Sequence, residues 1–132
     1  MKLTLSVVLV AIFAVGGGWL WGASGKSAIE LERRALQDRA DLSGARAVTL
    51  EGRVSLSLSN YGDAARSFAS ARSIVELTQT RFRETGQAER AGQLEIVLAH
   101  LKDAQRLSAA VDINAQNAAD QALQTLRSVE KP

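Results

Sequence analysis

Small and apolar residues in the middle of the chain recur at steps of three and four. The longer of two such stripes consists of Tyr61, Ala64, Phe68, Ala71, Val75, Thr78 and Phe82. A shorter stripe of the same period precedes it and consists of Ala47, Leu50, Val54 and Leu58. Steps of three and four place side chains on one face of an α-helix. The pattern therefore predicts two amphipathic helices that pack together through these stripes.

A short polar segment, residues 59–62, separates the two stripes. Asn60 is a favoured N-cap residue, and Asp63 lies in the first turn of the expected second helix, where a carboxylate interacts well with the helix dipole. A connection this short forces the second helix back alongside the first. We therefore expect an antiparallel helical hairpin.

Five residues of this hairpin have the spacing found in one tetratricopeptide repeat, with a small residue in the first helix, an aromatic at the turn, and alanine, a bulky residue and alanine in the second helix. They are Gly52, Tyr61, Ala64, Phe68 and Ala71. Residues 45–78 thus resemble a single repeat of that family, whose members bind other proteins. The resemblance implies that the small residues let the two backbones approach while Phe68 fills the space between them. A generic helical bundle is the alternative.

The last fifty residues predict two more helices. Gly86 is placed to end the preceding helix, and a third helix is expected from Gln87 to Ala110. Its stripe comprises Ala91, Leu94, Leu98, Leu101 and Ala104, widened by Val97 and Leu107. After a turn at residues 112–114, the fourth helix is expected to bury Ala115, Ala119, Ala122, Leu126 and Val129. The predicted class is all-α, with antiparallel hairpins in a bundle over residues 45–132, since two stacked hairpins bury a continuous core.

The N-terminus carries an apolar run from Leu3 to Trp21 without a charged residue. A helix of this length spans roughly 28 Å, close to the hydrocarbon thickness of a bilayer. Aromatic rings at its far end suit the headgroup region. We therefore expect residues 1–26 to form a transmembrane anchor and hinge, with the membrane-facing residues represented by Leu3, Val10, Phe13, Trp19 and Trp21.

A cleaved signal peptide, cut before Gly25, is the alternative for this segment. The orientation is also open, because Lys2 favours an inside N-terminus whereas Lys26 and the arginines beyond it favour an inside domain. A single apolar segment with a basic start typically exports the domain behind it. We therefore expect a single-pass protein of the bacterial inner membrane, with the bulk domain in the periplasm rather than the cytoplasm.

Residues 27–44 are densely charged and predict a solvated helical stalk that ends at a possible break, residues 41–44. Their apolar residues Ile29, Leu36 and Leu42 do not maintain a heptad, so the sequence gives little support for a coiled coil. The acidic pairs Glu30/Glu32 and Asp38/Asp41 lie among arginines and predict exposed surface.

The charge pattern argues against a nucleic-acid partner. Sixteen basic residues stand against fourteen acidic ones, giving a net charge of +2, and the two signs are interleaved along the chain. A nucleic-acid surface needs basic charge concentrated on one face. The cluster from Arg81 to Arg83 is short and is expected to be a helix end whose cations suit the dipole, with an anionic partner or a lipid headgroup as the alternative.

The sequence gives little indication of a catalytic or metal-binding site. The chain has no cysteine and a single histidine, His100. A metal site needs several convergent ligands, and a serine nucleophile needs a base in a recognisable arrangement. We therefore expect a non-enzyme with no cofactor, no metal and no small-molecule substrate.

These observations together predict a membrane-anchored helical module, an adaptor or scaffold, that binds another protein which the sequence does not identify. One alternative is a small accessory subunit of a larger membrane complex. The other is a secreted helical domain that has lost its leader.

Overall fold

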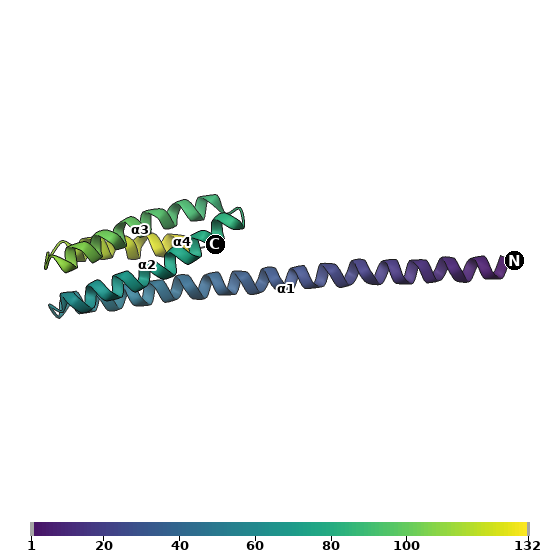
Figure 1. The fold of residues 1–132 in the computed structure, drawn as a ribbon, viewed down its shortest axis with the longest axis horizontal. Coiled ribbons are helices and arrows are strands. Elements are labelled where there is room, and N and C mark those ends of the chain that lie inside the picture. The colour runs from purple at the N-terminus through teal and green to yellow at the C-terminus, as the bar shows by residue number, and fades with distance from the viewer. Residues whose placement is uncertain (1, 132) are drawn as a thin grey trace. The chain divides into compact units, whose positions relative to one another are not determined.

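The computed structural model describes the backbone of residues 2–131 and the side chains of residues 27–131. The described chain forms four α-helices (Figure 1): α1 (Lys2–Ser57), α2 (Tyr61–Glu84), α3 (Ala88–Ala109) and α4 (Ala115–Glu130). The predicted all-α class is confirmed. The chain divides into two compact units, Met1–Gln37 and Asp38–Pro132.

The first unit consists of the N-terminal part of α1. Its described side chains, residues 27–37, are all exposed, including Ile29, Leu31 and Leu36. Within the residues whose side chains are described, no helix is long and apolar enough to cross a bilayer. The predicted anchor, Leu3 to Trp21, lies outside those residues.

The second unit is an antiparallel four-helix bundle, which confirms the bundle prediction. Helix α2 packs on α3, and α3 packs on α4. The last part of α1 lies beside α4, because Arg46 pairs with Glu130 at 3.0 Å and Arg53 pairs with Asp120 at 2.5 Å. These contacts close the bundle between its first and last helices.

The core follows the predicted stripes on three of the four helices. Helix α2 buries every member of its stripe except Tyr61, which is half-buried and packs against the core. Helix α4 buries all five predicted residues and adds Ala118 and Leu123. Helix α3 has its stripe turned slightly, since Val97 is fully buried whereas Leu98 and Leu107 are only partly so.

The prediction for α1 was wrong. Its buried face, which we call the inner face, consists of Leu42, Ala45, Thr49, Gly52 and Leu56. The stripe from Ala47 to Leu58 faces outward, and Val54 and Leu58 are 58% and 75% exposed. The physical reason is close packing: the inner face offers small residues against which α2 can approach, and the sum of buried contacts outweighs the larger apolar side chains of the other face.

Helix α1 also continues through the expected break at residues 41–44. A glycine inside a helix costs about 1 kcal/mol relative to alanine. Leu42 and Ala45 lie on either side of Gly44 and are both buried in the core, and their packing offsets that cost. The compact bundle unit begins at Asp38, seven residues before the boundary expected from the sequence.

The three turns of the bundle share one hydrogen-bonding pattern. At each helix end two backbone N–H groups reach back to the last turn, as Gln87 does to the carbonyl of Phe82 at 2.8 Å. This pattern needs one residue in the left-handed region, and Ser59, Gly86 and Val111 supply it with φ of 58°, 75° and 56°. Gly86 has the predicted role. Asn60 caps α2 as predicted, because its side chain accepts a bond from the N–H of Asp63.

Candidate protein-interaction surface

At Gly52 the backbone of α1 lies close to the Phe68 ring of α2. A Cβ atom added at Gly52 would lie 2.7 Å from Cε1 of the Phe68 ring and 3.0 Å from Cδ1 and Cζ. Real Cβ atoms do not make contacts this short, so a side chain at position 52 would force the fully buried Phe68 ring or the backbone of α1 to shift. The ring therefore packs directly on the backbone of α1.

The other residues of the resemblance surround this contact. Ala64 and Ala71 lie one turn on either side of Phe68 and are both fully buried, and Tyr61 is half-buried at the start of α2. The similarity to a tetratricopeptide repeat thus rests on this one hairpin. In the second hairpin, the last helix returns to α1 through the Arg46–Glu130 and Arg53–Asp120 ion pairs.

One end of the bundle carries large apolar side chains that the core does not use. The α1–α2 and α3–α4 turns lie at the same end (Figure 1). Leu58 in the first turn is 75% exposed, and Val111 and Ile113 in the second are 64% and 74% exposed. We call Leu58, Val111 and Ile113 the turn surface.

Val111 holds an unfavourable backbone conformation on this surface. Its φ is 56°, and a branched Cβ in the left-handed region is strained. Glycine fills the equivalent position after α2, where Gly86 has φ of 75°. The sequence therefore keeps an exposed apolar side chain at a position where glycine would fold more easily. Strain of this kind is typical of binding sites.

The outward side of α1 bears a second set of exposed residues. They are Ala40, Ser43, Ala47, Leu50 and Val54, which we call the outer stripe. Their steps of three and four place them on the helix side opposite the inner face. Helix α2 contacts α1 on the inner face, and α4 contacts it through the flanking Arg46 and Arg53. All five residues of the outer stripe are exposed.

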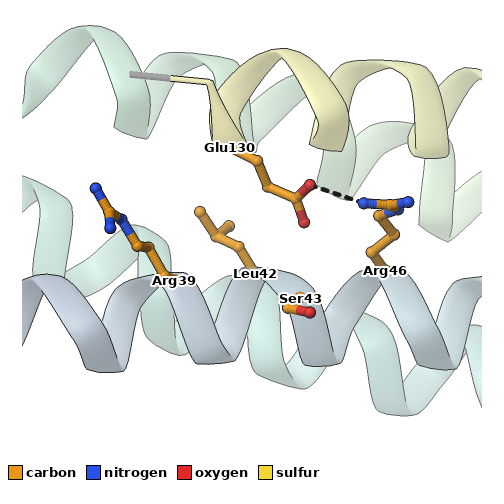
Figure 2. A pocket seen from close by; sticks show the side chains of 5 residues that line it. All are labelled: Arg39, Leu42, Ser43, Arg46 and Glu130. Carbon is orange, nitrogen blue, oxygen red and sulfur yellow. Dashed lines mark hydrogen bonds and ion pairs between the residues drawn. The ribbon is translucent and has the colours of Figure 1, made fainter.

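A shallow cleft of about 180 Å³ lies between α1 and α4. Figure 2 shows its lining: Glu130 reaches from α4 toward Arg46 of α1, while Arg39, Leu42 and Ser43 complete the wall. Within the described part of the chain, Nε of Arg46 and Oε1 of Glu130 are buried and have no hydrogen-bond partner. Small-molecule pockets usually measure about 300–1,000 Å³, so this cleft has room for one side chain of a partner and not for a complete ligand.

The acidic pair Asp38/Asp41 is not the exposed surface that the sequence indicated. Arg81 of α2 donates from Nε to Asp38 at 3.1 Å and from Nη2 to Asp41. The side chain of Asp38 is mostly buried and those of Asp41 and Arg81 partly so. Two carboxylates of α1 therefore neutralise Arg81, which leaves this guanidinium committed to the fold and not to an anionic partner.

The other members of the arginine cluster are also engaged. Phe82 is fully buried, and the guanidinium of Arg90 lies 4.4 Å from the centre of its ring, a cation–π contact. Arg83 lies 3.5 Å from Glu95 of α3. Residues 81–83 thus join α2 to its neighbours.

His100 lies half-buried on α3. Among residues 27–131, no three histidine, cysteine, aspartate or glutamate side chains converge in a way that could hold a metal ion.

Comparison with known proteins gives no relative: no family model, no curated protein and no solved structure matches the chain. The function is therefore argued from the bundle and its surfaces.

Proposed function

We propose that this protein is a membrane-anchored interaction module, with residues 1–26 as the anchor and the bundle as an adaptor or scaffold that binds another protein. The observation that carries the proposal is the turn surface. Leu58, Val111 and Ile113 together expose three large apolar side chains at one end of a bundle whose core is complete without them. Large apolar side chains exposed at one end of a bundle fit a surface that a protein partner covers.

The strain at Val111 supports this assignment. Exposed side chains contribute little to folding. A valine at φ 56° therefore lowers the stability of the bundle, and its side chain makes no compensating contribution to the core. A partner that covers the valine would offset this cost, because burial of its exposed apolar surface contributes about 25 cal/mol per Å². Anchoring would add to the effect, since confinement to a membrane raises the local concentration of the partner.

Extraction of the tagged full-length protein from its native membrane in mild detergent tests the proposal. Proteins that co-purify in stoichiometric amount are compared between the native chain and Leu58→Ser/Ile113→Ser. The matched control is Leu77→Ser/Ile96→Ser, which replaces two exposed apolar residues on α2 and α3 away from the turns. We expect the partner to be lost from the first variant and retained by the second. Equal retention by both variants would exclude the turn surface as the docking site.

The anchor has its own test. Mass spectrometry of the mature protein should find the N-terminal segment intact. A chain that starts at or near Gly25 would remove the anchor from the proposal and support the secreted domain. A complex whose partner is itself an integral membrane assembly would support the accessory-subunit alternative.

A further inference from the structure

The outer stripe of α1 differs from the turn surface in having a regular period. Ala40, Ala47 and Val54 are seven residues apart, and Ser43 and Leu50, also seven apart, fall between them. All five are exposed. Two such rows offset by three residues form the a and d positions of a heptad, the pattern through which two helices pack side by side. In the sequence, Leu36 precedes Leu50 by two heptads.

Small side chains dominate the stripe. Alanine and serine occupy Ala40, Ser43 and Ala47, while Leu50 and Val54 supply bulk toward the end of α1. Because the bundle packs on the opposite side of α1, a second helix can reach the stripe without meeting α2 or α4. The stripe therefore fits a helix whose own facing side is equally small.

The charges that flank the stripe identify the partner. Arg39, Arg46 and Arg53 repeat every seven residues along one flank, and Glu51 lies on the other. In a parallel pair of identical helices, a residue on the arginine flank of one copy meets the residue five positions later on the Glu51 flank of the other copy. Arg46 of each copy would then meet Glu51 of the other, which gives two symmetric ion pairs.

An antiparallel pair would instead bring like flanks together. The arginine rows of the two copies would then face each other, and this like-charge contact is unfavourable. Arg46 already donates to Glu130 at 3.0 Å, but a guanidinium has five N–H donors and can serve a second carboxylate. The charges that flank the outer stripes of two copies are therefore complementary only when the two helices are parallel.

We infer that the outer stripe of α1 is a self-association surface, on which a second copy of this chain docks in parallel through Ala40, Ala47, Leu50 and Val54. This surface is separate from the turn surface, so one dimer would present two copies of the proposed docking end. Two chains anchored by their N-terminal segments in one membrane would also meet in parallel, at high effective concentration.

Cysteine cross-linking of the full-length chain in its native membrane tests the inference, because the natural sequence has no cysteine. Single variants Ala40→Cys and Val54→Cys are treated with a short bifunctional thiol reagent, and the adducts are weighed by mass spectrometry. In a parallel dimer equivalent positions face each other, so both variants should give an adduct of twice the chain mass. Ser73→Cys and Gly92→Cys, exposed on α2 and α3, are controls and should react at least several-fold more slowly.

Three outcomes would overturn the inference. One is a rate at Ala40→Cys and Val54→Cys no greater than at the controls. The second is adduct formation only when the two variants are mixed, which signals an antiparallel pair. The third is cross-linking to a different protein. Each is independent of the co-purification test, so either proposal can fail without the other.

Charge exchange provides a second measurement on the same chain. Glu51→Arg should slow cross-linking at Val54→Cys several-fold, because it sets arginine against Arg46 of the other copy. The second change, Arg46→Glu together with Glu130→Arg in the same chain, should restore the rate by reversing the pair while positions 46 and 130 keep opposite charges. A slow rate that the second change does not restore would exclude the Arg46–Glu51 contact and with it the parallel register.

Discussion

The two faces of α1 show what decides which side of a helix becomes buried. The inner face combines Leu42 and Leu56 with a glycine, an alanine and a threonine, whereas the predicted stripe has Leu50 and Val54 on α1 and Leu58 just beyond its end. By hydrophobicity alone the outer side is the better candidate for the core, yet it is exposed. The inner face is buried because Gly52 admits the Phe68 ring and Asp38 and Asp41 meet Arg81. Fit to the neighbouring helix outweighs apolar content, and an apolar side left exposed is then free to bind something else.

The largest expected effect concerns the ring that the inner face accommodates. Phe68→Ala would remove a fully buried side chain and leave a cavity against Gly52, at a cost of about 3–5 kcal/mol in the free energy of unfolding. Urea unfolding of the full chain in detergent, followed by circular dichroism, measures the loss. An unfolding curve unchanged from the native one would contradict the core position of Phe68.

A comparison of two leucines near the end of α1 tests the faces directly. Leu56 is buried and Leu58 is 75% exposed. Leu56→Ala should cost about 2–5 kcal/mol, whereas Leu58→Ala should change stability by less than about 0.5 kcal/mol. The same unfolding assay compares them. Equal losses, or a larger loss at Leu58, would mean that α1 is rotated from the orientation described.

The ion pairs at the edge of the inner face should have an intermediate effect. Arg81→Met would leave the mostly buried Asp38 without its partner, and we expect a loss of about 1–3 kcal/mol. Arg83→Met is the control two residues on, because its pair with Glu95 is exposed and such pairs contribute about 0–1 kcal/mol. Chemical denaturation of both variants compares them, and similar midpoints would show that Arg81 does not bind α1 to α2.

A difference of similar size is expected between two glycines of the same helix. Alanine at either position gains the same helix propensity, about 1 kcal/mol. Gly44 has nothing within 4 Å of an added Cβ, whereas Gly52 meets Phe68 at 2.7 Å. Gly44→Ala should therefore raise the melting temperature, and Gly52→Ala should be less stable than Gly44→Ala by about 1–3 kcal/mol. Two variants of equal stability would show that the ring does not press on α1.

The sequence predicted α2 and α4 well, because their apolar residues occupy one face and polar residues occupy the rest. Phe68, Val75 and Leu126 could be placed in the core from spacing alone. The same reasoning failed to predict the buried face of α1. This helix has candidate stripes on two sides, and periodicity does not say which side packs on a neighbouring helix. A small residue such as Gly52 was the better signal, and it appeared in the repeat-like spacing.

Two features could not be predicted from local sequence patterns: the contact of α1 with α4 and the turn surface. Arg46 and Glu130 are separated by 84 positions, and a charge on an exposed helix side carries no sign of such a distant partner. The exposure of Val111 and Ile113 depends on how the α3–α4 turn projects from the bundle. The left-handed conformation of Val111 could not be predicted either, because valine rarely adopts a positive φ.

The contact between α1 and α4 bears on the order in which the bundle opens and closes. Helix α2 packs on α3 and α3 packs on α4, so those contacts form over short loops. The contact of α1 with α4 alone joins segments 67 and 84 residues apart through partly exposed ion pairs, which contribute little individually. This contact is therefore expected to form last and to open first. Amide hydrogens near Arg46 and Arg53 should exchange with solvent before those around Phe68, because α1 stays packed on α2 at Gly52 when its contact with α4 opens.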